Sequence, residues 1–265
     1  MIVCRSAAEI ERMRAANQLV ADVLAELEAA VAPGVTTADL DRLAERLVRE
    51  AGAVPAFKGY RGYPATLCIS VNEQVVHGIP SPDRALQSGD IVSLDIGARL
   101  NGFFGDSAVT VPVGNVPEST TRLLQVTRES LERAIEQAQV GGRLSDISHA
   151  VQSWVESHGY SIVREFVGHG IGEKLHEDPQ IPNYGAPGRG AKLAPGMVFA
   201  IEPMVAMGRP ETKVLADGWT AVTKDGSLAA HFEHTVAVSE DGPLVLTARK
   251  AAAGALSRSG SAGRG

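Results

Sequence analysis

The feature that most constrains this sequence is a pattern of acids at matched places in its two halves. The segment GDIVSLD, which ends at Asp95, corresponds to GMVFAIE, which ends at Glu202. Each is a glycine-led apolar run typical of a buried strand. A second pair of segments, DSAVTV and EHTVAV, begins with Asp106 and Glu233. Each half is therefore predicted to place one acid late in a strand and another at the start of the next strand.

Four acids within apolar strands need a shared counter-charge. An isolated carboxylate is very costly to bury, and none of the 25 lysines and arginines of the chain lies within the four segments. One such acid on its own could close a turn or pair with an arginine, but four acids at matched places favour a common partner. The pattern therefore predicts a pair of divalent cations.

Signals for helices repeat in the same order along the chain. Ser6 and Glu9 form a capping box before the first amphipathic stretch. Each half is predicted to contain a long helix, a glycine-containing turn, a shorter helix and then strands, which indicates an internal duplication of an α+β unit. The predicted helices run from Ser6 to Pro33, from the cap Thr37 to Gly52, from Pro117 to Gly141 and from the cap Ser145 to Gly159.

These signals predict one catalytic α+β domain over residues 1–250, with halves of about 5–113 and 114–247 packed around a central antiparallel sheet. If a pseudo-two-fold axis relates the halves, the acids of one half face the acids of the other. The remaining residues, 251–265, are rich in Ala, Gly, Ser and Arg and are predicted to be disordered.

A histidine between glycines lies between the two pairs of acids, in the segment FVGHGIG. The sequence that follows is short and ends at Pro179, so a phosphate-binding loop that opens a helix is not favoured. The glycines beside His169 are predicted to let the backbone turn sharply and aim the imidazole inward. Next to four acids, His169 is predicted to be a fifth metal ligand.

The sequence resembles the pita-bread metallopeptidases at five positions that match their metal ligands: Asp95, Asp106, His169, Glu202 and Glu233. The motifs NEQVVHGIP, GHGIG and EPM narrow the resemblance to type I methionine aminopeptidases, over about residues 5–247. It implies the pita-bread fold, with two pseudo-symmetric halves around a dinuclear metal site. It also implies hydrolysis of the first peptide bond, which removes methionine from newly made proteins whose second residue is small and uncharged.

The resemblance also implies a role for each ligand. Asp95 is expected to chelate the first metal, Asp106 and Glu233 to bridge both, and His169 and Glu202 to complete the second. Four carboxylates and one imidazole suit Co, Mn or Fe at least as well as Zn, so the sequence leaves the metal open.

Three residues are implied to act on the substrate. Glu202 is expected to shuttle a proton as well as bind metal. His77 resembles the residue near the scissile amide nitrogen, and His176 the residue that steadies the tetrahedral oxyanion. Without the surrounding motifs, either histidine would be interpreted as structural.

A pocket for the methionine side chain is also implied. Sulfur contacts aromatic rings favourably, and three of the pocket residues lie in a loop broken by Gly and Pro, where packing in the core is not expected. A catalytic pair of Cys68 and His77 is an alternative, although nothing around the cysteine resembles a thiol hydrolase motif. The expected pocket residues are Phe57, Tyr60, Tyr63, Cys68 and Trp219.

Two further features follow from the resemblance. Asn72, Gln74 and Ala229 match positions where relatives hold a monovalent cation through backbone carbonyls. Position 76 is Val where many relatives have Cys, and position 175 is Leu where some have Phe; neither change removes a ligand.

Composition narrows the partners and the location. A formal net charge of −6 gives no electrostatic case for DNA. The first residues lack the apolar core of a signal peptide, and no apolar run is long enough to cross a bilayer. The two cysteines are too few for a disulfide scaffold. We expect a cytoplasmic monomer that acts on the N-termini of nascent polypeptides, with the ribosome as a candidate docking partner.

Two alternatives remain open at this point. A pita-bread aminopeptidase that cleaves Xaa-Pro bonds would share the five ligands and differ in the pocket. A non-enzymatic binding protein of the same fold is the alternative from a different class, although such proteins have lost ligands that this sequence retains.

Overall fold

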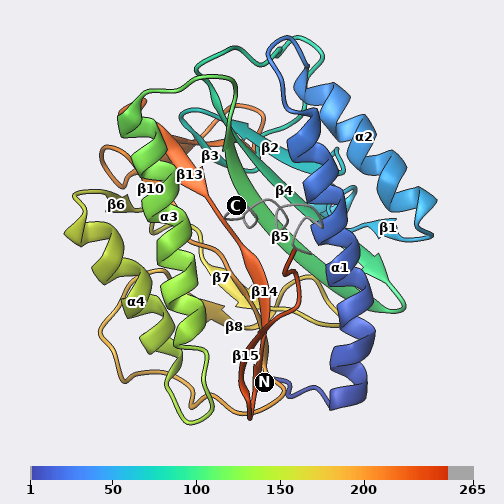
Figure 1. Ribbon diagram of the computed structural model, residues 1–265, viewed down its shortest axis with the longest axis vertical. Helices are drawn as coiled ribbons and strands as arrows, with labels where there is room; N and C mark the ends of the chain where they lie inside the picture. The colour runs from blue at the N-terminus through green and yellow to red at the C-terminus, as the bar shows by residue number, and fades with distance from the viewer. Residues whose placement is uncertain (1, 250–265) are drawn as a thin grey trace, which may run out of the picture.

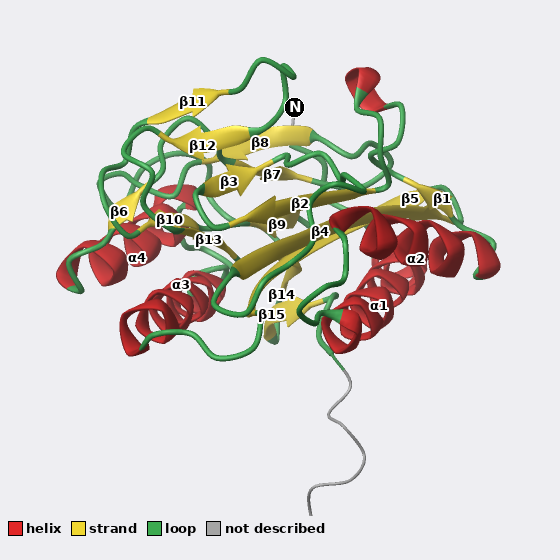
Figure 2. Cartoon of the chain, turned by 90° about the horizontal axis from the view of Figure 1, so that it is seen from above, coloured by secondary structure: helices red, strands yellow, loops and turns green. Residues whose placement is uncertain are grey.

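Helices cover one face of a set of curved antiparallel sheets in the computed structural model, which describes residues 2–249 (Figures 1 and 2). One helix pair lies on each side of the molecule in Figure 1, which matches the predicted order of a long helix followed by a shorter one. A short 3-10 turn, η1, spans Tyr60–Gly62. The helices are α1 Ala7–Ala30, α2 Thr37–Glu50, α3 Glu118–Glu136 and α4 Leu144–Ser157.

The capping box predicted for α1 is confirmed, whereas two other predicted caps are wrong. The N-cap of α2 is Thr36, because Asp39 bonds back to its backbone N–H and so completes the box one residue earlier. The N-cap position of α4 is Arg143. Ser145 is not free to cap, because its hydroxyl exchanges hydrogen bonds with the backbone of Arg189.

The first half contributes a four-stranded sheet in which β4 pairs with β1, β2 and β5. Its centre is a hairpin whose strands pair over their full length. Asn101 and Gly102 both have positive φ, as a two-residue hairpin turn requires. The strands are β1 Val54–Pro55, β2 Leu67–Val71, β4 Ile91–Leu100 and β5 Phe103–Pro112.

The second half contributes a five-stranded sheet in the order β15-β14-β9-β7-β8. There are two further three-stranded sheets among the described residues, β13-β10-β6 and β11-β12-β3, and the latter takes β3 from the first half. The strands of the large sheet are β7 Gly168–Gly170, β8 Glu177–Ile181, β9 Val198–Ile201, β14 His234–Ser239 and β15 Gly242–Val245. Those of the small sheets are β3 Gln74–Val76, β6 Ser161–Ile162, β10 Met204–Ala206, β11 Thr212–Val214, β12 Ala221–Thr223 and β13 Ala229–His231.

Hydrogen bonds tie the two halves together where β5 passes the start of β14. Ala108 and Glu233 form an isolated antiparallel bridge, in which the N–H of Glu233 donates to the carbonyl of Ala108 at 2.9 Å. The hydroxyl of Ser107 donates to the carbonyl of Glu233 at 2.6 Å, and that of Thr235 to the carbonyl of Asp106 at 2.8 Å. The acids of the two halves are thereby brought to one place.

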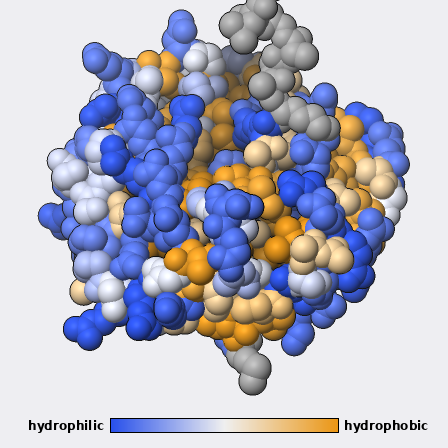
Figure 3. Space-filling model, turned by 60° about the horizontal axis from the view of Figure 1, so that its bottom comes forward, coloured by the Kyte–Doolittle hydropathy of each residue, from blue (hydrophilic) through white to orange (hydrophobic). Residues whose placement is uncertain are grey.

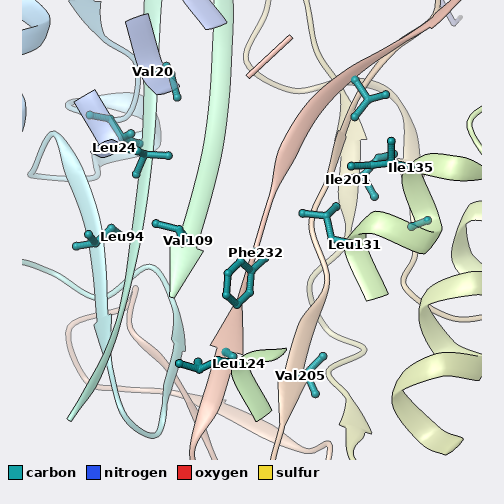
Figure 4. Packing of buried hydrophobic residues seen from close by; sticks show 14 of the residues in the cluster. Val20, Leu24, Leu94, Val109, Leu124, Leu131, Ile135, Ile201, Val205 and Phe232 are labelled. Atoms are coloured by element: carbon teal, nitrogen blue, oxygen red, sulfur yellow. The ribbon is translucent and has the colours of Figure 1, made fainter. Parts of the chain in front are cut away.

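The main hydrophobic core lies between the sheets and the helices (Figure 4). Strand alternation explains its position, because Leu94 is fully buried toward the helices while Asp95 points to the opposite face. Each fully buried leucine of this kind stabilises the fold by roughly 1.5–3 kcal/mol. The labelled members of the core in Figure 4 are Val20, Leu24, Leu94, Val109, Leu124, Leu131, Ile135, Ile201, Val205 and Phe232.

Hydrophilic side chains cover much of the surface in Figure 3, with apolar side chains gathered near the centre of that face. Within residues 2–249, no helix is both long and apolar enough to cross a membrane. The predicted disorder of residues 251–265 concerns a segment outside the described residues.

Candidate metal centre

The register of the central hairpin places the acids of the first half on one face. Asp95 pairs with Ala108 across the two strands and Gly97 pairs with Asp106, so the two acids are diagonal neighbours with the same orientation. Neither acid lies at the predicted end of its strand. Both are well inside ten-residue strands, because the tight turn lets the hairpin continue beyond them.

The acids of the second half do lie at strand ends. Glu202 follows β9 directly, and its carbonyl accepts a hydrogen bond from the side chain of Asn183 at 2.9 Å. Glu233 precedes β14 and is held by the bridge to Ala108. Four acids therefore converge from two strand interiors and two strand ends.

The buried acids have the unpaired oxygens that a cation would satisfy. Asp95, Asp106 and Glu233 each have one carboxylate oxygen that is buried without a hydrogen-bond partner among the described residues. Potential ligand atoms of Asp106, His169 and Glu233 all lie within 4.8 Å of one another. Buried polar atoms are normally paired, so this donor set fits a metal centre.

The geometry of His169 also suits a ligand. Its Nδ1 lies 2.9 Å from the carbonyl of Gly170, which fixes the proton on Nδ1 and leaves the lone pair of Nε2 available. Nε2 lies 3.6 Å from Oε1 of Glu202. Glu202 and Asp95 line the same cavity but lie outside the tighter three-residue group.

The predicted role of the glycines beside His169 is wrong in part. The imidazole does face the cavity, but the three residues form strand β7, whose pairing with β8 shifts register between His169 and Gly170, and make no sharp turn. A Cβ on Gly168 would lie 2.5 Å from the carbonyl oxygen of Ala200, and one on Gly170 would lie 2.1 Å from that of Asp178. The glycines are needed because neighbouring backbone approaches β7 from both sides.

Burial makes the carboxyl groups poor anions without a counter-charge. Desolvation raises the pKa of Asp95 to about 7 and that of Glu202 also to about 7. It raises the pKa of Asp106 and Glu233 well above the usual range, and the negative charges of neighbouring carboxylates raise both further. Positive charge from a cation would reverse both effects.

His77 and His176 lie at the same cavity and are both neutral near pH 7. Burial lowers the pKa of His77 to about 4. Partial desolvation at the rim of the cavity, followed by the positive charges of neighbouring groups, lowers the pKa of His176 to about 3, although the residue is exposed on its outer side. The Nδ1 of His176 lies 3.0 Å from the hydroxyl of Tyr60, and their rings stack with centroids 5.2 Å apart.

A cavity of about 150 Å³ joins the acids to the expected methionine pocket. The prediction that the aromatic loop lies outside the core is wrong in part, since Phe57 and Tyr63 are buried in a hydrophobic cluster with Met13. The ring of Phe57 packs over Gly97, where a Cβ would come within 2.7 Å of it, and the hydroxyl of Tyr63 donates to the carbonyls of Leu67 and Gly78. The cavity is lined by Phe57, Tyr60, Arg61, Tyr63, Cys68, His77, Asp95, Asp106, His169, Leu175, His176, Glu202, Trp219 and Glu233.

Cys68 lies opposite Asp95 in the pairing of β2 with β4 and is buried. Burial raises the pKa of its thiol, and the charge of Asp95 adds to the rise. A neutral thiol is a poor nucleophile, so the structure does not favour the alternative in which Cys68 performs catalysis.

His231 is a site residue that the sequence interpretation missed. It is buried, its Nε2 lies 3.6 Å from Oε2 of Glu202, and that nitrogen has no hydrogen-bond partner among the described residues. The sequence did hold a signal, because His231 precedes Glu233 by two residues, and strand alternation places such a pair on the same face.

A larger cavity, of about 600 Å³, lies on the helix side of the molecule between β5, β15 and α3. It is lined mainly by apolar side chains such as Val109, Leu124 and Phe232. Size alone would favour this cavity, but the converging acids lie in the smaller one, and the chemistry therefore belongs there.

Comparison with known proteins decides the family. Residues 11–240 match the description of metallopeptidase family M24. The chain belongs to metallopeptidase family M24. Its resemblance to the methionine aminopeptidases is confirmed by a methionine aminopeptidase of Clostridium acetobutylicum, which is 55% identical over 93% of this chain and 99% of that protein.

Solved structures of M24 relatives confirm the pita-bread fold. The crystal structure of a methionine aminopeptidase from Thermotoga maritima has a TM-score of 0.92 at 49% identity, and the match covers 94% of this chain and all of that one. A prolidase from Pyrococcus furiosus shares the fold at a TM-score of 0.77 and 24% identity, with 94% of this chain and 66% of that one covered. The larger prolidase extends beyond the matched region.

Proposed function

We propose that this M24 enzyme removes the N-terminal methionine from newly made proteins whose second residue is small and uncharged. The observation that carries the proposal is a single cavity that joins buried, unpaired carboxylates to an aromatic pocket. The carboxylates suit peptide hydrolysis, and the pocket suits a thioether side chain. Similarity to methionine aminopeptidases over nearly the whole chain supports the same substrate.

The cofactor that we propose is two divalent cations drawn from Co, Mn, Fe or Zn. Asp95 would chelate one ion, Asp106 and Glu233 would be shared, and His169 and Glu202 would complete the other. When bound at such a site, the ions polarise the scissile carbonyl and make a water molecule more acidic. The unpaired carboxylate oxygens and the free lone pair of His169 support this arrangement.

Three side chains would move or stabilise protons and charge during hydrolysis. Glu202, with its raised pKa, would carry a proton to the departing amine. If the hydroxyl of Tyr60 donates to Nδ1 of His176, the proton of that neutral imidazole is on Nε2 and can donate to the tetrahedral oxyanion. His77 stands edge-on to the rings of Phe166 and Trp219 and would contact the scissile amide nitrogen.

The pocket would select methionine by shape and soft contacts. Phe57, Tyr60, Tyr63, Cys68 and Trp219 would surround the thioether, and the rings of Tyr63 and Trp219 meet edge to face at 5.2 Å. The second side chain of the substrate would be confined beside His77. A cavity of this size leaves little room for a large second residue.

Substrate series test the proposal. We expect the metal-loaded enzyme to cleave Met-Ala-Ser rapidly and Met-Phe-Ser at least about 10²-fold more slowly in kcat/KM, because a steric clash of about 3 kcal/mol gives that factor. Equal rates for the two peptides would exclude a closed second-residue site. Faster cleavage of Ala-Pro peptides would instead favour the Xaa-Pro alternative.

Metal titration tests the cofactor. The demetallated protein should be inactive and should recover on addition of Mn, Fe, Co or Zn, with saturation at two ions per chain. Saturation at one ion would contradict the dinuclear arrangement. A metal-free protein that still bound a macromolecular partner and never hydrolysed peptides would favour the non-enzymatic alternative.

The cellular setting extends the proposal. We propose one catalytic domain over residues 1–250 built from two halves, acting as a cytoplasmic monomer on nascent chains with the ribosome as docking partner. Size-exclusion chromatography and co-sedimentation with ribosomes test these points. A monovalent cation at Asn72, Gln74 and Ala229 is a further proposal, supported by the 2.9 Å bond between the Ala229 N–H and the Asn72 carbonyl, which joins two of the three residues.

A further inference from the structure

The N-terminal segment supplies a buried arginine that none of the proposed catalytic steps uses. Arg5 precedes α1, and only 6% of its side chain is exposed. Its Nη2 makes bonds of 2.7 and 2.8 Å to the two carboxylate oxygens of Glu177. Glu177 directly follows His176 in the chain and is the first residue of β8.

Several contacts fix the guanidinium of Arg5 against the segment that leads to His176. A Cβ on Gly172 would lie 2.3 Å from Nη2, so the guanidinium packs directly on the backbone there. The same Oε1 of Glu177 that accepts from Arg5 also accepts from the N–H of Lys174 at 3.0 Å. The segment from Gly172 to Glu177 thus folds around the guanidinium of Arg5, whose Nη1 also lies 3.7 Å from a carboxylate oxygen of the exposed Glu173.

The backbone of Arg5 is anchored as firmly as its side chain. Its N–H donates to the carbonyl of Gly196 at 2.7 Å, and a Cβ on Gly196 would lie 2.3 Å from the Arg5 carbonyl oxygen. The guanidinium also lies 5.7 Å from the ring centroid of Phe103 in the first half. Arg5 therefore links the hairpin of the first half to the segment that carries His176.

We infer that Arg5 is a positioning residue for the reaction, which acts through Glu177 to hold the imidazole of His176 at the cavity. His176 itself lies at the exposed rim, where its ring contacts Tyr60 and lies 4.2 Å, centroid to centroid, from the ring of His169. A side chain at the rim needs a rigid backbone to keep its place. A buried ion pair provides geometry more reliably than it provides stability, which suits this role. The inference rests on the proposed function of His176.

Kinetics of two substitutions test the inference. Arg5→Met removes the charge and keeps much of the length, whereas Arg5→Lys keeps the charge but lacks the second terminal nitrogen, which in Arg5 faces Glu9 and Glu173. With Met-Ala-Ser, Arg5→Met should lower kcat by at least about tenfold. The loss should not exceed the 10²–10³-fold expected when the oxyanion donor itself is removed. KM should change much less, and Arg5→Lys should recover part of the loss. Arg14→Met removes an arginine of α1 whose side chain is 40% exposed and paired with Glu11; it is the matched control and should leave kcat unchanged.

A double substitution separates positioning from general destabilisation. If Arg5 acts through His176, the double variant Arg5→Met/His176→Ala should have the same kcat as His176→Ala alone. Losses that multiply in the double variant would overturn the inference. If Arg5→Met does not fold, Glu177→Gln is the alternative, because it keeps the shape of the side chain and removes the negative charge. It should lower kcat less than Arg5→Met and should likewise have no further effect when His176 is Ala.

A spectroscopic measurement does not depend on activity. In the metal-free full-length protein, the imidazole NMR signals of His176 should shift or broaden in Arg5→Met, while those of His77 stay in place. An unchanged His176 signal would overturn the inference. An inactive wild-type enzyme with a shifted His176 signal in the variant would instead contradict the proposed function and leave the positioning contact intact.

Discussion

The two halves bring equivalent acids to one centre by different backbone routes. In the first half, Asp95 and Asp106 lie inside long strands joined by a tight turn. In the second half, Glu202 and Glu233 lie at strand ends, separated by the segment that forms β10 to β13. Yet burial raises the pKa of Asp95 and of Glu202 alike to about 7. The comparison teaches that the desolvated cavity sets the charge state, while each half is free to vary the strands that carry the acids.

The largest effect expected is from removal of one acid of the first half. Asp106→Ala should abolish peptidase activity and weaken metal binding, because we assign Asp106 to both ions. Turnover and metal content of the purified variant are the measurements. Glu240→Gln, an exposed acid beyond β14, should change neither. Near-normal turnover with unchanged metal content in Asp106→Ala would show that the acids of the first half are not needed at the metal centre.

The next effect concerns a side chain of the second half that contacts the first. His176→Ala should lower kcat by about 10²–10³-fold and change KM much less, since an oxyanion donor acts chiefly on the transition state. Steady-state kinetics with Met-Ala-Ser measure both constants. An effect confined to KM would show that His176 binds the substrate in its ground state. The second half would then supply no donor to the oxyanion through His176.

A smaller effect follows from the shared electrostatics of the halves. With pKa values raised to about 7 or higher, the acids keep protons in the metal-free protein at pH 6, and cation binding must expel them. Metal affinity should therefore rise with pH between about 5 and 7, by about tenfold per pH unit for each proton released. His77 and His176, with their pKa lowered to about 4 and 3, are already neutral in this window.

Calorimetry can test this linkage directly. Titrations of Mn²⁺ in buffers of different ionisation enthalpy should show protons released on binding at pH 6 and fewer at pH 8. Binding without proton release at pH 6 would mean that the acids of both halves are ionised before the metal arrives.

The smallest effect compares one glycine from each half. In Gly97→Ala, the new methyl group meets the movable ring of Phe57 at 2.7 Å, whereas in Gly168→Ala it meets the backbone oxygen of Ala200 at 2.5 Å. Overpacking costs about 1–3 kcal/mol, and the free energy of unfolding should fall further for Gly168→Ala, since backbone yields less than a ring. Thermal unfolding should show a lower melting temperature by about 2–4 °C for each kcal/mol lost. The reverse order would show that the second half is the more adaptable one.

The sequence by itself determined the local features of this protein. The capping box of Ser6 and Glu9, the order of helices and the alternation that turns Leu94 to the core and Asp95 away from it depend on neighbours a few residues apart. The matched acids and His169 could also be identified from the sequence, because acids within apolar strands require a counter-charge whatever the fold. The family resemblance then implied the fold that the solved structures of M24 relatives confirm.

Only the tertiary structure decided which distant residues meet. The burial of Phe57 over Gly97 and the pairing of Arg5 with Glu177 join segments that no local pattern connects. The role of Gly168 in admitting neighbouring backbone was hidden for the same reason. Local propensity depends on contacts a few residues apart, whereas burial and charge pairing depend on which segments the fold packs together, and that is fixed only when the halves dock.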